Sequence, residues 1–241
     1  MFKKFLAAMM LAVTTFTFTA CSDDSDSTTT EKSTKSTEST ISANKPKVGP
    51  EKAIEDFAMV QFYGTTGDDN AAAASTGMKP DEIDKFFKQK VKECADDFKE
   101  EYLLNDETAT EMAIFYLAKC ADSSNLTAKL KKDDDINPVV TVTFAPVDND
   151  AIIKKMRSNS EFVDLMGTIE GSRNDPKARK ELENNAEYQA TILQGLEEEI
   201  FDDIPVKAAK SVDMECEVAQ GYDGKNYWTP VDPEVLSQIA H

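Results

Sequence analysis

Histidine is almost absent from this chain of 241 residues, because His241, the last residue, is the only one. This scarcity excludes Ser-His-Asp and Cys-His catalysis, and it excludes zinc and iron sites that depend on histidine ligands. The sequence also lacks the Gly-x-Gly-x-x-Gly, phosphate-loop and Gly-x-Ser-x-Gly motifs, and it contains no internal repeat. We therefore expect a protein that is not an enzyme and that has no cofactor and no metal site.

Positive charge is also in short supply, with 27 Lys and Arg against 45 Asp and Glu and a net charge of −18. Binding to nucleic acid requires clustered Lys and Arg, and so does lying flat on anionic lipid. A solvated acidic surface is the favoured interpretation, and binding to cationic partners is the alternative. The composition therefore predicts no nucleic-acid partner.

The first twenty residues are typical of a secretory signal peptide. Lys3 and Lys4 precede the uncharged run Phe5–Ala20, which ends in small residues. As a helix this run of sixteen residues is about 24 Å long, which is short for a hydrocarbon layer of ~30 Å. We therefore predict a cleaved signal peptide over residues 1–20 and favour it over a retained transmembrane anchor.

The sequence Phe18-Thr19-Ala20-Cys21 resembles the lipobox of bacterial lipoproteins, in which a small residue precedes a cysteine that is diacylated after cleavage. Phe18 departs from the aliphatic residue that is usual at its position. The resemblance implies that Cys21 is the lipidation site and that a diacylglyceryl anchor, carrying fatty acids such as palmitate, holds the protein on the extracytoplasmic face of the cell membrane. Two acyl chains hold a protein stably on a membrane, whereas a single acyl chain does not. An ordinary secretory signal with an incidental cysteine is the alternative.

A polar linker is predicted over residues 21–49. Ser and Thr make up thirteen of the 24 residues from Ser22 to Lys45, and Ile41 is the one large apolar side chain among them. Such a segment buries too little apolar surface to offset the entropy of ordering it. As a coil it spans roughly 25–30 Å. The remaining residues, 50–241, are long enough for a single domain with a sizeable core.

Apolar residues recur at helical spacing in the first half of this domain. Pro50 predicts a helix that ends near Gly64. Pro80 begins a long helix that ends at Asn105 or Asp106, and a further helix is expected over residues 108–121. These last two predict a helical hairpin. No regular structure is expected over residues 68–79.

Alternating patterns then predict four strands. They cover residues 126–130, 139–144, 212–218 and the segment around Tyr227, with Gly221–Gly224 as a turn. Short helices are expected after Asp148–Asp150 and through Ile169, and one helix is expected from Pro176 to Ile200. Asp232 is expected to cap a short last helix. The predicted fold class is α+β: one antiparallel sheet of about four strands, helices packed on one face, and a helical insertion.

The stretch VDMECEVAQGYDGKNYW followed by TPVDPEVLSQIA, residues 212–240, resembles the end of small lipoproteins of the Gram-positive type (Firmicutes) whose domain has no assigned function. The helix that begins at Pro50 and the strand Val139–Phe144 resemble elements of the same families. Many of these have a cone-shaped, cystatin-like fold related to nuclear transport factor. The resemblance implies lipid anchoring and a ligand cavity, and it implies no catalytic residue.

Three cysteines remain in the mature chain, Cys94, Cys120 and Cys216, so at most one internal disulfide is expected. Cys94 and Cys120 are the best pair, because their expected offset of about 6 Å along two helices is near the bridging limit. All three lie on apolar stripes. Buried free thiols are therefore the favoured interpretation, ahead of a disulfide or a reactive thiol.

Acidic runs and a group of aromatic residues are the other candidates for function. The acidic runs are Asp133–Asp135, Asp148–Asp150, and Glu197–Glu199 with Asp202 and Asp203. They lack the spacing of a calcium loop, and solvated turns and helix ends are favoured. Tyr222, Tyr227 and Trp228 are candidates for stacking on a sugar or a peptide, although core packing is the favoured role.

The sequence thus predicts a non-enzymatic binding or interaction module at the cell surface, with a small molecule, a peptide or an envelope protein as its partner. A carboxylate-dependent hydrolase of the envelope is the first alternative, and it requires two acids across a cleft. A structural subunit of a membrane complex is the second.

Overall fold

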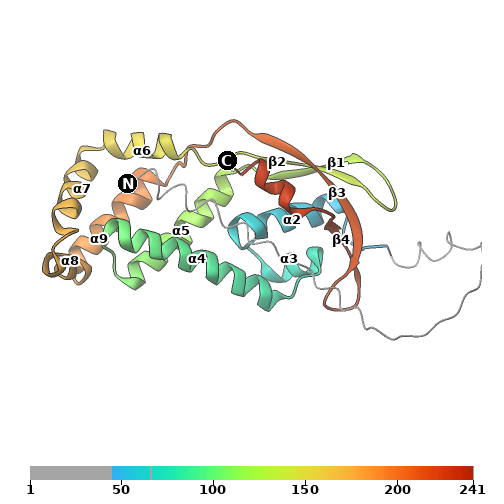
Figure 1. The fold of residues 1–241 in the computed structure, drawn as a ribbon, viewed down its shortest axis with the longest axis horizontal. Helices are drawn as coiled ribbons and strands as arrows, with labels where there is room; N and C mark the ends of the chain where they lie inside the picture. Colours follow the sequence, from blue (N-terminus) through green and yellow to red (C-terminus); the bar gives the residue numbers. More distant parts are fainter. Residues whose placement is uncertain (1–44, 66, 241) are drawn as a thin grey trace, which may run out of the picture.

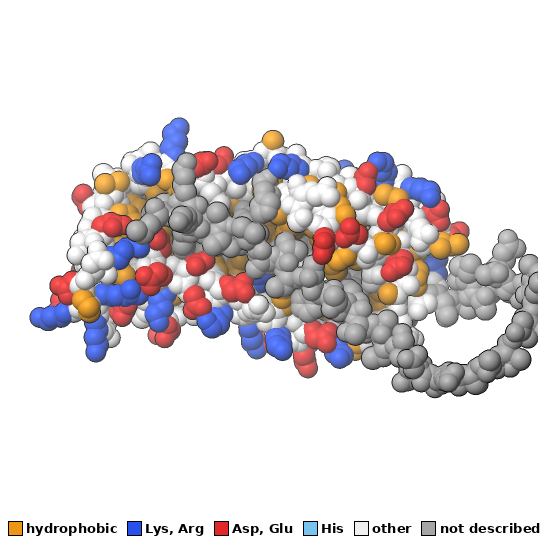
Figure 2. Space-filling model, in the orientation of Figure 1, with side chains coloured by type: hydrophobic (Ala, Val, Ile, Leu, Met, Phe, Trp, Pro, Cys, Tyr) orange, Lys and Arg blue, Asp and Glu red, His pale blue; other side chains and the backbone are white. Residues whose placement is uncertain are grey.

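The computed structural model describes residues 45–65 and 67–240, and it has the predicted α+β fold. The predicted signal peptide, Cys21, most of the predicted linker and His241 lie outside the described residues. The domain is elongated, with the sheet and the first helices at one end and a group of short helices at the other (Figure 1). Acidic and basic side chains are interspersed over the described part of the face that Figure 2 shows.

Helix α2, Pro50–Tyr63, begins with proline in its first turn and ends at Gly64, as predicted. The expectation of irregular structure over residues 68–79 is wrong, because helix α3 covers Asp69–Thr76. The Asp68 side chain accepts hydrogen bonds from the backbone N–H groups of Asn70 and Ala71, both at 3.0 Å. This cap, followed by four alanines, makes a short helix favourable.

Helices α4 (Pro80–Tyr102) and α5 (Asp106–Ser123) form the predicted hairpin along the length of the domain (Figure 1). Asn105 caps α5 by accepting a hydrogen bond from the N–H of Thr108 at 2.9 Å. Phe98, which is 1% exposed, packs its ring against those of Tyr116 and Phe201. The core of the domain therefore continues from the hairpin into the far group of helices.

The sheet contains four antiparallel strands in the order β1-β2-β3-β4. The strands are β1 Thr127–Lys132, β2 Val139–Phe144, β3 Lys210–Gln220 and β4 Asn226–Pro230. Helix α2 packs on the face of the sheet that points into the core, and this face carries Val140, Val142, Met214 and Cys216. The prediction that helices cover one face of the sheet is therefore confirmed. Val218, which continues the alternation of Met214 and Cys216, is 40% exposed, so the alternation along β3 does not bury every second residue.

The helical insertion lies between β2 and β3. It consists of α6 Asn149–Ser158, α7 Ser160–Ser172, α8 Pro176–Glu183, α9 Ala186–Gln194 and a π-helical turn at Gly195–Ile200. The prediction of one helix from Pro176 to Ile200 is wrong. Asn185 interrupts it and caps α9 by accepting a hydrogen bond from the N–H of Tyr188 at 3.1 Å. Asp232 caps the last short helix, Pro233–Gln238, as predicted.

Gln189, in α9, hydrogen-bonds this insertion to the turn between α4 and α5. Its side-chain amide donates to the carbonyl oxygens of Leu103 at 3.3 Å and Leu182 at 3.0 Å. Its side-chain oxygen accepts from the backbone N–H of Asn105 at 3.0 Å. Leu103 is the left-handed residue that ends α4, with φ of 54°. One buried side chain therefore satisfies three backbone groups that belong to two parts of the chain.

Arg173, at the end of α7, makes a second link to the same region. Its guanidinium donates to the backbone oxygen of Glu101 at 3.0 Å and lies 3.5 Å from the Glu101 carboxylate. The two side chains are 15% and 8% exposed. Burial raises the pKa of Glu101, and the positive charge of Arg173 opposes that rise.

Candidate binding groove at the β3–β4 turn

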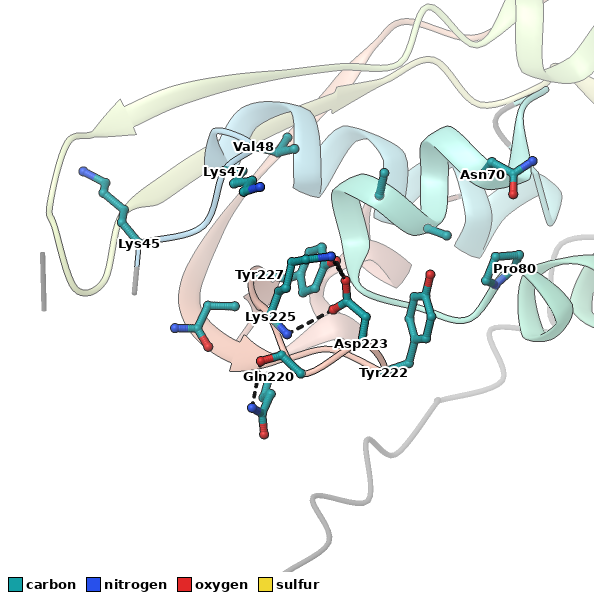
Figure 3. Close-up of a pocket in the computed structure, with 14 residues that line it drawn as sticks. Lys45, Lys47, Val48, Asn70, Pro80, Gln220, Tyr222, Asp223, Lys225 and Tyr227 are labelled. Carbon is teal, nitrogen blue, oxygen red and sulfur yellow. Dashed lines mark hydrogen bonds and ion pairs between the residues drawn. The ribbon is translucent and has the colours of Figure 1, made fainter. Parts of the chain in front are cut away.

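Three segments meet around a hollow at the sheet end of the domain: residues 45–48, helix α3 and the turn between β3 and β4 (Figure 3). We call this hollow the hairpin groove. Its volume is about 550 Å³, within the ~300–1,000 Å³ that is usual for small-molecule sites. It is lined by Lys45, Lys47, Val48, Asn70, Ala73, Ala74, Pro80, Gln220, Tyr222, Asp223, Gly224, Lys225, Asn226 and Tyr227.

The ring of Tyr227 is held in place by two glycines. A Cβ atom at Gly77 or at Gly221 would lie 2.5 Å from a carbon of this ring, so neither position has room for a side chain. Gly77 also has φ of +73°, which ends α3 in the left-handed conformation. The backbone N–H of Tyr222 donates to the carbonyl oxygen of Gly77 at 3.2 Å. Helix α3 and the turn therefore form one tightly packed wall of the groove.

Asp223 organises the turn itself. Its carboxylate accepts a hydrogen bond from the Tyr227 hydroxyl at 3.1 Å, forms an ion pair with the Lys225 ammonium, and accepts from the backbone N–H of Lys225 at 3.0 Å (Figure 3). Lys225 lowers the pKa of Asp223 for this reason. Tyr222, in contrast, leaves 52% of its surface exposed. The groove thus combines a fixed polar wall with one open aromatic ring.

Substituting Gly77 with alanine tests how closely this wall is packed. Left-handed strain alone costs about 1–2 kcal/mol, and forcing the Tyr227 ring to move adds about 1–3 kcal/mol. Gly67→Ala is the matched control, because Gly67 has φ of +88° but no heavy atom beyond its own chain neighbours lies within 4 Å of the new Cβ. Denaturant unfolding of both variants measures the difference. Equal losses of unfolding free energy would contradict the tight packing.

Two of the three aromatic candidates are brought together in the groove. Tyr222 and Tyr227 line it, whereas Trp228 belongs to the hydrophobic core and is 3% exposed. Core packing, the favoured role, is therefore confirmed for Trp228, and the stacking alternative does not apply to it. Neighbouring residues of a strand point to opposite faces, so Tyr227 and Trp228 cannot share one site.

The sequence did not indicate the other walls. Lys45 and Lys47 belong to the predicted linker, and Asn70 lies in the segment for which no structure was expected. Asp68 followed by four alanines is the local pattern that predicts α3, but nothing local places that helix beside a turn some 150 residues later in the chain.

The acidic runs lie in turns and at helix ends, as favoured. Asp134 accepts hydrogen bonds from the backbone N–H groups of Ile136 and Asn137 and from Lys132, which lowers its pKa. Asp148 caps α6 by accepting from the N–H of Ala151 at 3.1 Å. In the part of the chain that the structure describes, no group of three or more Cys, His, Asp or Glu side chains is placed to hold a metal ion.

Glu197–Glu199 belong to the π-helical turn at the end of α9, where Glu198 and Glu199 are exposed. Partial burial, followed by the charges of Glu111 and Glu198, raises the pKa of Glu197. Asp202 and Asp203 are exposed just beyond this turn, and Asp202 lies 3.3 Å from the ammonium of Lys119. This run is therefore a solvated helix end.

The three described cysteines are buried free thiols, which confirms the favoured interpretation. Cys94, Cys120 and Cys216 are 5%, 3% and 0% exposed. Burial raises the pKa of Cys120 to about 12 and that of Cys216 to about 11, and it raises the pKa of Cys94 as well. Because the thiolate is the reactive form, these side chains act as small apolar groups.

No family model matches this chain, and no curated protein matches it either. A similar solved structure is that of a proposed lipoprotein, ycdA, from Bacillus subtilis subsp. subtilis str. 168. It is 13% identical, with a TM-score of 0.45, and the match covers 78% of this chain and 53% of that one. The chain thus spans about half the length of this neighbour. The neighbour is described as a lipoprotein, and the cystatin-like family stays a prediction for this chain.

Among the described helices, none combines the length and the apolar character needed to cross a membrane.

Proposed function

We propose that this chain is a lipid-anchored, non-enzymatic binding protein of the extracytoplasmic membrane face, and that its ligand occupies the hairpin groove. The observation that carries the proposal is the preformed wall of the groove: the Tyr227 ring between Gly77 and Gly221, beside the exposed ring of Tyr222. Small-molecule sites are usually formed before the ligand arrives and contain a few fixed polar groups.

The single carboxylate among the described lining residues of the hairpin groove supports binding rather than hydrolysis. Asp223 is the one acid among the described residues that line it. Both of its oxygens accept hydrogen bonds within the turn, from Tyr227, from the Lys225 side chain and from the Lys225 backbone. Glycoside hydrolysis requires two carboxyl groups about 5–10 Å apart. The groove offers one, and that one already has partners.

A ligand panel tests the binding function. We expect at least one compound from a set of metabolites, peptides and saccharides to raise the melting temperature of the wild-type chain, because a ligand that binds the folded state stabilises it. The same compound should lose this effect in Tyr222→Ala. Compounds that stabilise both proteins equally would place the ligand outside the hairpin groove, and a panel without any hit would contradict the proposal.

Anchoring through Cys21 rests on the sequence Thr19-Ala20-Cys21. We expect cells that are fed labelled palmitate to incorporate it into the wild-type protein and not into Cys21→Ala. The wild-type protein should sediment with membranes, and the variant should appear in the soluble extracytoplasmic fraction, because two acyl chains are needed for stable anchoring. Cys216→Ala, which removes a buried thiol, is the control and should be labelled like the wild type. Equal labelling of the Cys21 variant would disprove the anchor.

A further inference from the structure

Several polar groups that line the hairpin groove have no hydrogen-bond or ion-pair partner among the described residues. They are the Asn70 side-chain amide, the Lys47 ammonium, the Tyr222 hydroxyl and the side-chain oxygen of Gln220, whose nitrogen donates to Gly224. The exposed Tyr222 ring adds a flat apolar surface with a polar edge. These groups are the ones that remain for a ligand.

The backbone of the turn, in contrast, is largely used within the fold. Four N–H groups donate internally: Gly221 to the carbonyl of Lys225, Tyr222 to that of Gly77, Gly224 to that of Gly221, and Lys225 to the side chain of Asp223. An extended peptide that adds to a sheet depends on free backbone groups. Recognition at this turn must therefore come from side chains, which disfavours a peptide that adds to the sheet as a further strand.

Charge narrows the choice further. Lys45 and Lys225 line the groove, but they form ion pairs with Asp135 and Asp223, so Lys47 is the one cation of the lining without a described partner. The whole chain has a net charge of −18, and it repels a ligand that carries many negative charges. The ligand that fits is uncharged overall and rich in hydroxyl groups.

On this basis, and resting on the proposed binding function, we infer that the hairpin groove binds a neutral oligosaccharide. The apolar face of a sugar ring stacks on Tyr222. Hydroxyl groups of the sugar both donate and accept hydrogen bonds, which matches the amide of Asn70, the oxygen of Gln220 and the ammonium of Lys47. The volume of about 550 Å³ accommodates a short sugar chain rather than a single small ion.

Isothermal titration of the full mature chain in detergent with short neutral oligomers of glucose, xylose and N-acetylglucosamine is the test. We expect one of these series to bind. Tyr222→Ala should weaken that binding at least about tenfold, equivalent to ~1.4 kcal/mol, whereas Tyr222→Phe keeps the ring and should stay within about threefold, ~0.65 kcal/mol. Asn70→Ala should also weaken it.

Matched control variants distinguish the effect of substitutions in the hairpin groove on binding from the effect of any surface substitution. Ile114→Ala removes an exposed apolar side chain from α5, and Lys177→Gln removes an exposed charge from α8 at the far end of the domain (Figure 1). Both should bind like the wild type.

Three results would overturn the inference. Tyr222-dependent binding of a peptide or a metabolite, without binding of any neutral oligosaccharide, would refute the ligand class and leave the proposed function standing. Tighter binding of galacturonic acid oligomers than of neutral ones would refute the neutral character. Saccharide binding that neither Tyr222→Ala nor Asn70→Ala weakens would refute the site.

Discussion

Arg173→Met is expected to lower the free energy of unfolding by about 3–5 kcal/mol, the usual cost of removing one partner of a buried ion pair. Glu101 would stay buried at 8% exposure without its counter-charge, and its backbone oxygen would lose the hydrogen bond from Arg173. A domain of this kind has a total stability of about 5–15 kcal/mol. The substitution therefore removes a large share of it, which denaturant unfolding measures directly.

The stability of this variant should also depend on pH in a defined direction. Burial already raises the pKa of Glu101, and removing Arg173 takes away the charge that opposes the rise. A carboxyl group whose pKa is higher in the folded than in the unfolded chain binds protons preferentially in the folded state. Stability linked to it is present at low pH and is lost as pH rises through the folded pKa. The deficit of Arg173→Met relative to the wild type should therefore narrow between pH 7 and pH 5.

Arg179→Met is the control for this experiment. Arg179 pairs with Glu100 and Glu183, but the Glu100 side chain is 66% exposed and water screens the pair. We expect a loss of at most about 1 kcal/mol. If both arginine variants lose the same stability, or if the deficit of Arg173→Met is constant with pH, then Glu101 is not the buried charge that we describe.

Gln189→Leu is expected to destabilise the domain by about 2 kcal/mol or more. Leucine has a similar volume but leaves the N–H of Asn105 and the carbonyl oxygen of Leu103 without the Gln189 side chain, whereas the carbonyl oxygen of Leu182 keeps its hydrogen bond from the N–H of Asn185 at 3.1 Å. Each buried polar group without a partner costs about 1–3 kcal/mol. Because these bonds join the insertion to the α4–α5 turn, hydrogen exchange should show faster opening of α8 and α9.

Gln194→Leu, on the same helix, makes the same chemical change at the surface. The Gln194 side chain is exposed and donates only to Glu198, at 3.0 Å. We expect a change within about 0.5 kcal/mol, as for most surface substitutions. If the two variants were equally stable, the network around Gln189 would contribute nothing measurable.

Patterns between near neighbours in the chain predicted most of the secondary structure. Pro50 and Pro80 begin helices, Asn105 caps one, and the alternation along Val139–Phe144 forms a strand. Each of these depends on one turn of helix or on the period of two in a strand, so the residues that decide it lie within a few positions of one another. The errors at α3 and at Asn185 concern local features too, because both helices begin at a capping side chain, Asp68 or Asn185, that bonds to residues two or three positions later.

The candidate site could be predicted only in part. Tyr222 and Tyr227 were candidates because aromatics near a turn often bind ligands, but the sequence did not distinguish them from Trp228. The period of two separates Tyr227 from Trp228, yet which of the two faces is the core depends on the helices that cover the sheet. Those helices come from residues 50–123, far from the strand in sequence.

By itself, the sequence determined the α+β class and the lack of histidine chemistry, because composition and local periodicity settle these without any long-range contact. Lipidation at Cys21 stays a prediction that rests on the resemblance to the lipobox. Only the tertiary structure determined where the hairpin groove lies and which backbone groups the Gln189 side chain bonds. Residues 45–48, α3 and the β3–β4 turn meet there, and Gln189 reaches the α4–α5 turn from more than 80 residues away. Such contacts depend on close packing between elements, and no pattern of neighbouring residues encodes which surfaces will fit.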